Sequence, residues 1–335
     1  MREKQLSVII PAYNCNRYIA ECISSIYDNF HGDRESLEII VVDDGSKDET
    51  PRILDELERE HPESMKVIHQ DNGGVSRARN VGIERMSGAY FTYIDADDVF
   101  MGNAIDEIYE KIQADEYVDM IVFDYKDINE NGEEVYYQQV TKGLENQESL
   151  GKSFLFHHYF NTCWGRVYRA KEETKRLRFP EGIKIGEDVI YMSKLIDNIR
   201  TVACIEKPLY GYRIFDDSVM MQTRNVLDRE VIKCMETTIK NKEDFAIEHF
   251  KDQSVLAGYY QEYSKVISSK VHFCMDSNLS KTEKKQQINA FLTNPQVVRV
   301  LRKAFFARGV KLKRRMISFI YLNKFLRQVY LCQVR

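Results

Sequence analysis

Five aspartates stand directly behind two short apolar runs of the sequence, at residues 37–42 and 90–94. These aspartates are Asp43, Asp44, Asp95, Asp97 and Asp98. Carboxylates gathered at neighbouring strand ends repel one another unless a positive group binds there. Mg²⁺ and Mn²⁺ prefer oxygen ligands, in most sites one or two carboxylates together with substrate phosphates. The pattern therefore predicts a divalent-cation site, with an acidic turn or a helix cap as the structural alternative.

The elements that would position these aspartates alternate along the first 125 residues. Short apolar runs, typical of strands buried on both faces, are separated by segments in which apolar residues recur every three or four positions, as on one face of a helix. The predicted strands cover residues 6–10, 37–42, 65–69, 90–94 and 118–123, and the predicted helices cover 19–30, 49–60, 75–86 and 101–113. This alternation predicts an α/β fold with a doubly wound, mostly parallel sheet. Ligands bind such sheets beyond the carboxyl ends of the strands, where the aspartates stand.

The pattern changes after residue 125. Asn131-Gly132 lies between two strand-like segments, which predicts a hairpin. The remaining predicted elements are helices over 149–158 and 188–199, and strands over 202–205 and 209–213. From residue 226 onward the chain contains one proline and two glycines, and it is expected to be helical. We expect a first domain over residues 1–220 and an all-helical extension over 221–335.

Two common nucleotide-binding motifs are absent. A dinucleotide-binding fold needs GxGxxG at the first turn from strand to helix, whereas residues 11–16 read PAYNCN. The phosphate-binding motif GxxxxGK[ST] does not occur either. A nucleotide at this sheet would therefore be held in some other way.

The composition indicates a globular protein of the cytoplasm. Hydrophobic residues make up 43% of the chain and charged residues 30%. The sequence has no apolar stretch long enough to cross a membrane, and the run in MREKQLSVII is too short for a signal-peptide core. The seven cysteines are scattered and form no CxxC pair, so we expect neither a zinc site nor a disulfide framework.

Five sequence blocks together resemble the family 2 glycosyltransferases. The blocks are Pro11-Ala12-Tyr13-Asn14, Asp43-Asp44-Gly45-Ser46, Asn72-Gly73-Gly74-Val75-Ser76, Ala78-Arg79-Asn80-Val81-Gly82 and Asp95-Ala96-Asp97-Asp98. Their order and spacing fit the family, and the resemblance runs from about Ser7 to Ser218. It implies an inverting enzyme with the A-type fold, whose nucleotide-sugar-binding catalytic domain would be residues 1–220.

The resemblance also implies donor-binding residues. Those for the nucleoside would be Pro11, Ala12, Tyr13, Asp44, Asn72, Gly74 and Arg79. Asp44 would accept a hydrogen bond from uracil, which favours a UDP-sugar, and the fork of Arg79 would meet uracil or phosphate oxygens. Asp95-Ala96-Asp97 would be the DxD motif. In it Asp97 would bind Mn²⁺ or Mg²⁺, and Asp95 would contact the ribose or water on the metal.

Such a metal suits the chemistry of sugar transfer. Breaking the bond between the anomeric carbon and phosphate leaves negative charge on the UDP diphosphate. A cation at that point stabilises the charge as it develops.

The acceptor side needs a base for the attacking hydroxyl. Gly186-Glu187-Asp188-Val189 resembles the Glu-Asp motif of the family, in which Asp188 would be the base and Glu187 would contact the acceptor. A plain helix cap favoured by the helix dipole is the alternative, and the dipole would lower the pKa of these carboxyl groups.

Three further residues carry weaker expectations. Trp164 is either a stacking surface for the acceptor sugar or a core aromatic. Arg213 is either a diphosphate contact or a surface arginine, and Ser218 belongs to the same segment, which resembles one that closes on the diphosphate.

The last 37 residues differ in charge from the rest. Residues 299–335 contain eleven Lys or Arg and no Asp or Glu, while the rest of the chain has 37 basic and 52 acidic residues. This basic, apolar tail predicts either a helix on an anionic membrane surface, which would suit a lipid-linked acceptor, or a helix packed against the acidic body. No nucleic-acid motif accompanies the charge, so we expect no nucleic-acid partner. The helical extension could also form a homodimer.

The resulting prediction is an inverting, metal-dependent transfer of a sugar from a UDP-sugar to a hydroxyl of an acceptor glycan, in the synthesis of a cell-surface polysaccharide. A sugar nucleotidyltransferase is one alternative, but it would show a glycine-rich, basic loop after the first strand, which is missing. A scaffold protein that binds nucleotide-sugars without catalysis is the other.

Overall fold

The structure, a computed structural model of the whole chain, describes residues 4–28, 30–115, 117–183, 185–215 and 226–331. The chain forms two compact units, one of residues 1–153 with 159–214 and one of residues 154–158 with 215–335. Each has its own buried apolar core. The predicted boundary at residue 220 and the predicted contact Ser218 lie outside the described residues.

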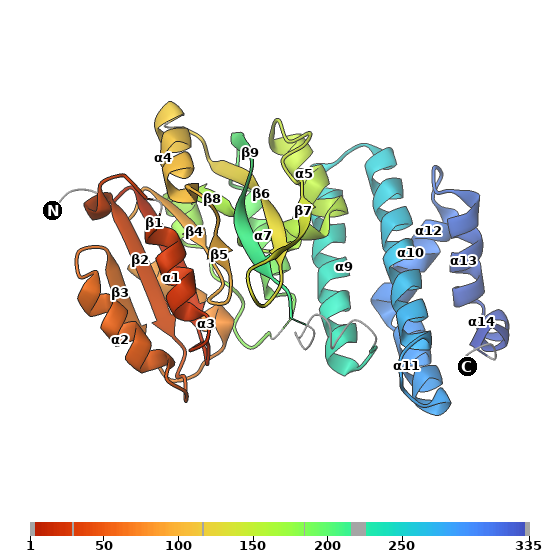
Figure 1. Cartoon of the computed structure of the whole chain (residues 1–335). Coiled ribbons are helices and arrows are strands. Elements are labelled where there is room, and N and C mark those ends of the chain that lie inside the picture. The colour runs from red at the N-terminus through yellow and green to blue at the C-terminus, as the bar shows by residue number, and fades with distance from the viewer. Residues whose placement is uncertain (1–3, 29, 116, 184, 216–225, 332–335) are drawn as a thin grey trace. The chain divides into compact units, whose positions relative to one another are not determined.

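The parallel half of a nine-stranded sheet has the strand order β3-β2-β1-β4 (Figure 1). Its strands are β1 (Leu6–Ala12), β2 (Leu37–Asp43), β3 (Met65–His69) and β4 (Tyr90–Tyr93), and its connecting helices are α1 (Ile19–Tyr27), α2 (Thr50–Glu60) and α3 (Val75–Arg85). The chain moves outward from β1 to β3 and then returns past β1 to β4. Because such crossovers are right-handed, this reversal places α3 on the opposite face from α1 and α2. The predicted doubly wound arrangement is confirmed here, with its switch point between β1 and β4.

The other half of the sheet is mixed. β8 (Arg166–Arg169) lies antiparallel between β4 and β6 (Met120–Ile128), and β9 (Val202–Arg213) runs parallel to β6. Two short strands pair antiparallel at its margins, β5 (Val99–Phe100) with β9 and β7 (Glu134–Gln138) with β6. The helices of this half are α4 (Ala104–Ala114), α5 (Gln147–Phe156), α6 (Glu172–Lys175) and α7 (Glu187–Ile196). The two strands predicted near the end are one strand, β9.

β8 was not predicted, because it begins and ends with arginine. Arg166 is nevertheless completely buried. Its guanidinium donates to the backbone carbonyls of Tyr159, Thr162 and Trp164 and lies over the Tyr159 ring. The preceding turn thus supplies the partners that a buried charge requires, a feature that local patterning does not reveal.

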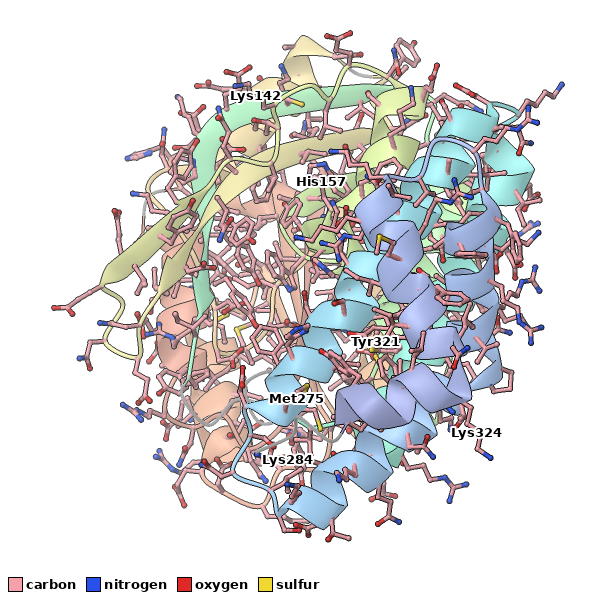
Figure 2. The ribbon with its side chains drawn as sticks, turned by 90° about the vertical axis from the view of Figure 1, so that its right-hand side faces the viewer. Lys142, His157, Met275, Lys284, Tyr321 and Lys324 are labelled. Carbon is pink, nitrogen blue, oxygen red and sulfur yellow. The ribbon has the colours of Figure 1, made fainter. Side chains whose placement is uncertain are left out.

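The second unit is helical (Figures 1 and 2). Its helices are α9 (Arg229–His249), α10 (Gln253–Met275), α11 (Lys281–Thr293), α12 (Pro295–Phe306), α13 (Leu312–Leu322) and α14 (Lys324–Leu331). α10 packs against α9, α11, α12 and α13. Asp228, Asp252, Ser280 and Asn294 cap the first four of these helices with their side chains. Within the described ranges, no helix is long and apolar enough to cross a bilayer.

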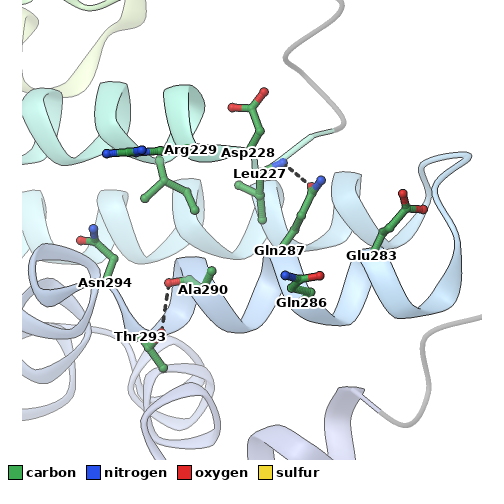
Figure 3. Close-up of a pocket in the computed structure, with 10 residues that line it drawn as sticks. Leu227, Asp228, Arg229, Glu283, Gln286, Gln287, Ala290, Thr293 and Asn294 are labelled. Atoms are coloured by element: carbon green, nitrogen blue, oxygen red, sulfur yellow. Dashed lines mark hydrogen bonds between the residues drawn. The ribbon is translucent and has the colours of Figure 1, made fainter.

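A pocket of about 490 Å³ lies between the start of α9 and α11 (Figure 3). Amide side chains, among them Gln286, Gln287 and Asn294, line it. The Leu227 N–H donates to Gln287 Oε1 at 2.8 Å and joins the residue before α9 to α11. This pocket contains none of the residues predicted to do chemistry.

Candidate functional site

The loop after β1 is tied to the loop after β2. The Asn14 N–H donates to Ser46 Oγ at 2.9 Å, and Asn14 Oδ1 accepts from the Lys47 N–H at 2.8 Å. Asn14 has a φ of 49°, in the left-handed region that asparagine tolerates better than most residues. Ala12 is buried, whereas Tyr13 is 51% exposed. The turn therefore presents an aromatic ring to solvent beside the predicted uridine pocket, with Pro11 in the strand below it.

Asp44 is buried and organises the glycine loop that precedes α3. Its Oδ1 accepts from the Gly73 N–H at 2.9 Å and from Gln70 Nε2 at 2.6 Å, and its Oδ2 accepts from the Gly74 N–H at 2.7 Å. A carboxylate oxygen can accept two hydrogen bonds, so Oδ2 keeps the capacity for one from a ligand. Asn72 of the same loop is exposed.

Asp43, the residue before Asp44, contacts His69, which in turn contacts Asp55. Asp43 Oδ1 accepts from the Ser46 N–H at 3.0 Å, and Oδ2 contacts His69 Nδ1 at 2.8 Å. His69 Nε2 lies 3.1 Å from Asp55. Burial alone would lower the pKa of His69, but the hydrogen bonds to Asp43 and Asp55 raise it above its ordinary value. Both carboxylate oxygens of Asp43 thus have hydrogen-bond partners within the chain.

Both carboxylate oxygens of Asp98 accept a hydrogen bond from β9. The Tyr210 hydroxyl donates to Oδ2 at 2.6 Å, and the Arg213 N–H donates to Oδ1 at 2.7 Å. Burial, followed by the charges of Asp97 and Asp95, raises the pKa of Asp98 well above its ordinary value. Asp98 therefore fastens β9 to the end of β4, a structural role that the sequence did not reveal.

Asp97 differs from these aspartates. In the ranges that the structure describes, its carboxylate makes no hydrogen bond or ion pair with another residue, although its carbonyl accepts from Arg213 Nε at 2.8 Å. Burial raises the pKa of Asp97 to about 6, and the neighbouring charge of Asp95 adds to the shift. A divalent cation would supply the missing positive charge, and a hard carboxylate oxygen suits Mg²⁺ or Mn²⁺.

No group of three or more His, Cys, Asp or Glu side chains is placed to hold a metal ion among the described residues. The donor set at Asp97 fits a cation that takes its other ligands from water and substrate phosphates, as Mg²⁺ usually does. Of the five aspartates whose mutual repulsion predicted a cation site, Asp97 and Asp95 therefore remain as the residues that would face the cation.

Arg79 of α3 joins three segments that are distant in sequence. Its Nη2 lies 2.9 Å from Asp95, and its Nη1 lies 2.7 Å from Asp188 and 3.4 Å from Glu187. The side chain is only 4% exposed and lies over the Phe179 ring. We expected Arg79 on the wall of the nucleotide pocket. In the structure its fork contacts carboxylates and brings the DxD and Glu-Asp motifs to a common point, and its contact with the nucleotide stays a prediction.

Glu187 and Asp188 begin α7, behind Gly186, whose φ is 93°. Burial raises the pKa of Glu187 to about 7 and the Asp188 charge adds to it, against the opposing effect of Arg79. Burial also raises the pKa of Asp188 above its ordinary value, although Arg79 opposes it. The expected lowering by the helix dipole is therefore outweighed by desolvation.

Asn80 is a positioning residue that sequence reasoning missed. Its Nδ2 donates to the Phe179 carbonyl at 3.0 Å, and its Oδ1 accepts from the Phe179 N–H at 2.8 Å. Phe179 stacks on Tyr191 of α7 with ring centroids 3.8 Å apart. These contacts attach the segment before α7 to α3, the helix that carries Arg79. An asparagine on the buried side of a predicted helix was the only sequence sign.

Two predicted ligand contacts lie in the interior. Trp164 is 5% exposed and stacks on Tyr210 and Tyr212, which fits the core alternative and leaves the indole face covered. Arg213 is 2% exposed. Its donors meet the carbonyls of Asp97 and Glu130 and the carboxylate of Glu21. Arg213 thus holds the DxD loop, and its phosphate contact stays a prediction.

Comparisons with known proteins identify the family of this chain. The sequence model of glycosyl transferase family 2 matches residues 7–174, half of the chain. Glycosyltransferase GlyA of Streptococcus pneumoniae is 31% identical over 63% of this chain and 31% of its own length. The minor teichoic acid biosynthesis protein GgaA of Bacillus subtilis is 30% identical over 62% of this chain and 46% of its own length. The chain thus spans less than half of either relative.

Solved structures share the fold. Residues 1–349 of S. aureus TarS in complex with UDP-GlcNAc give a TM-score of 0.65 at 20% identity, covering 97% of this chain and 92% of that one. The mannosyltransferase PcManGT of Pyrobaculum calidifontis, in complex with GDP-Man and Mn²⁺, gives 0.51 at 16% identity, covering 99% and 86%. With the five blocks, the switch-point site and the matching family model, the chain belongs to glycosyl transferase family 2.

Proposed function

We propose that this protein transfers a sugar from a UDP-sugar to a hydroxyl of an acceptor glycan, with inversion at the anomeric carbon. The observation that carries the proposal is the buried Arg79, which contacts Asp95 of the donor side and Asp188 of the acceptor side. One guanidinium thereby holds together two motifs about 90 residues apart, which supports a single site for donor and acceptor.

The donor nucleoside would lie over the loops that follow β1 and β2. Tyr13 is free to cover the uracil ring, and Asp44 Oδ2 has a lone pair for the ring N–H. Pro11, Ala12, Asn72 and Gly74 would shape this pocket. A TarS fragment with this fold binds UDP-GlcNAc, which supports the donor class, although at 20% identity it leaves the sugar open.

Asp97 would hold the metal ion, Mn²⁺ or Mg²⁺, with diphosphate oxygens and water as the other ligands. When bound, the ion stabilises the negative charge that develops on the leaving diphosphate. Asp95, held by Arg79, would face the ribose or the water on the metal. A structural relative with Mn²⁺ and GDP-Man supports a divalent metal in this fold.

Asp188 would act as the base. Its carboxylate takes the proton of the acceptor hydroxyl as that oxygen bonds to the anomeric carbon and the bond to UDP breaks. Glu187 would contact the acceptor beside it. Arg79 orients Asp188 through the 2.7 Å contact, and it stabilises the anionic form on which proton abstraction depends.

The relatives support the acceptor and the location less directly than they support the donor. GgaA is named for minor teichoic acid biosynthesis, which supports an acceptor in a cell-surface polymer, and that acceptor would be lipid-linked. We propose a cytoplasmic location, peripheral to the membrane. The six cysteines among the described residues are free thiols, which suits a reducing compartment. A homodimer through the helical unit stays a prediction.

The first experiment is a thermal-shift panel of nucleotides and UDP-sugars with and without Mn²⁺, on wild type, Asp97→Asn and the exposed control Asp28→Asn. A ligand that binds the native state raises the midpoint. We expect one UDP-sugar to act only with metal, in wild type and control but not in Asp97→Asn. Stabilisation by a different nucleotide would refute the uracil assignment of Asp44, and no response to any nucleotide would refute the proposed donor site. Stabilisation without UDP release to any acceptor would favour the scaffold alternative.

A further inference from the structure

α12 and α13 expose large apolar side chains on the outside of the helical unit. Phe306, Leu312, Met316 and Phe319 are 72%, 71%, 58% and 45% exposed. The last three are spaced by four and three residues, so they lie on one side of α13. The opposite side of α13 buries Tyr321, labelled in Figure 2, whose hydroxyl lies 3.4 Å from Ser268 of α10. The helix thus has a packed face and an apolar exposed face.

The exposed apolar residues of the two helices join into one patch. The Phe305 ring contacts Phe306 with centroids 4.7 Å apart and stacks on Phe319 at 5.6 Å. Arg315 donates to the Phe305 carbonyl and thereby fixes the turn between α12 and α13. A contiguous exposed apolar patch of this kind marks an interaction surface rather than the scatter expected of a monomer surface.

Exposed cations surround this patch. They are Arg302, Lys303, Arg308, Lys311 and Lys313. Within the described part of the chain none of them has a carboxylate at ion-pair distance, whereas Arg299 of the same region pairs with Glu243. The sequence has no Asp or Glu after Glu283. Glu262 of α10, near the turn at Lys311, is already paired with Lys265.

We propose that this basic-apolar face, formed by these five cations with Phe306, Leu312, Met316 and Phe319, docks on an anionic phospholipid surface. The charge selects this occupant, because an aggregate of like-charged faces would repel itself, whereas lipid phosphates complement the cations. The apolar side chains enter the boundary between headgroups and acyl chains, while the cations remain at headgroup level. The packed faces of α12 and α13 keep the unit folded on the surface.

The test is vesicle flotation of the full chain, with vesicles of phosphatidylcholine alone or mixed with phosphatidylglycerol. One variant combines Phe306→Ser, Met316→Ser and Phe319→Ser, and a second combines Lys303→Glu, Lys311→Glu and Lys313→Glu. Each variant has a matched control at exposed residues elsewhere. The control for the apolar variant combines Val135→Ser and Tyr136→Ser, and the control for the lysine variant combines Lys66→Glu, Lys142→Glu and Lys240→Glu. All substituted side chains are exposed, so the variants are expected to fold, which circular dichroism checks.

We expect wild type and both controls to float with the anionic vesicles only, and to be released by salt. Each cation near the surface contributes about a fivefold factor in partitioning, so the loss of three cations alone should weaken binding roughly a hundredfold, and repulsion of the three new carboxylates should weaken it further. The apolar variant should also stay at the bottom. Equal flotation of variants and controls, or no binding of wild type, would overturn the proposal. So would concentration-dependent association of wild type without vesicles that the apolar variant abolishes, because the face would then bind a second copy. No donor or metal is needed, so this outcome is independent of the transferase proposal.

Discussion

Five buried or half-buried carboxylates of the candidate site form two groups with different partners. Asp43, Asp44 and Asp98 accept hydrogen bonds of 2.6 to 3.0 Å from the chain itself. Asp97 has no such partner in the described ranges, and Glu187 has one long contact of 3.4 Å with Arg79. Burial raises the pKa of Asp97 and Glu187, but it also raises the pKa of Asp98, so the hydrogen-bond partners and not the pKa distinguish the two groups.

This difference separates structure from chemistry. A carboxylate that the chain satisfies holds loops and strand ends in place. A carboxylate that is buried without adequate partners carries an electrostatic cost, which a cation, a substrate or a proton can relieve. The two groups should therefore respond oppositely to mutation, the first by losing stability and the second by losing activity.

Replacement of Asp97 should have the largest effect. Asp97→Asn removes the proposed metal ligand, so transfer measured as UDP release should fall roughly a hundred- to a thousandfold in kcat/KM. The thermal midpoint should stay the same or rise, because a carboxylate with a raised pKa destabilises the fold when it ionises. Asp28→Asn serves as the control. Wild-type activity in Asp97→Asn would remove Asp97 from the site.

Asp98→Ala should reduce stability, which Asp97→Asn should not. It leaves the Tyr210 hydroxyl and the Arg213 N–H without their acceptor in the interior, which costs on the order of 2–4 kcal/mol in the free energy of unfolding. Urea denaturation measures this loss. A variant as stable as wild type would place Asp98 in the second group.

The pH dependence of Glu187 should give an intermediate effect. Its folded pKa of about 7 exceeds its unfolded value, so the native state binds more protons and stability should fall as pH rises from about 4.5 to 7. Glu187→Gln should remove up to on the order of 2 kcal/mol of this fall. Denaturation at several pH values, on wild type and the variant, measures it. Identical pH profiles of stability for wild type and Glu187→Gln would mean that the chain provides Glu187 with sufficient hydrogen-bond partners, as it does for Asp43.

His69→Ala should have the smallest effect, because the imidazole is 43% exposed. Its pKa is raised, so its contribution is present below the unfolded pKa of about 6.5 and is lost as pH rises through the folded value. We expect a loss of less than about 1 kcal/mol at pH 6, a smaller one at pH 8, and unchanged activity. A strong loss of activity would mean that the contact between His69 and Asp43 is needed for catalysis.

The parallel half of the sheet followed directly from the sequence, because strands buried on both faces appear as short apolar runs and loops as polar blocks. The mixed half did not. β8 contains Arg166, which is buried through contacts with the preceding turn, and such compensation is invisible in local pattern. Its insertion between β4 and β6 depends on tertiary contacts.

At the site, the residue types and their strand ends were predictable, but the partners were not. The repulsion argument counted the five aspartates equally, whereas Tyr210, His69 and the glycine-loop amides provide hydrogen bonds to three of them. Sequence reasoning also missed the contact between Arg79 and Asp188, because nothing in the sequence connects residue 79 with residue 188. Contacts over such separations are set by topology rather than by composition.

The position of β8 has a consequence for synthesis on the ribosome. β4 pairs with β1 on one side and with β8 on the other, so its second edge stays open until residues 166–169 have been made. At about 5–20 residues per second, this interval lasts on the order of 4–14 s. An unpaired, apolar strand edge is a template for association with other nascent chains. A fragment that stops after β6 would lack β8, the native partner of this edge, so we expect it to aggregate more readily than the full chain.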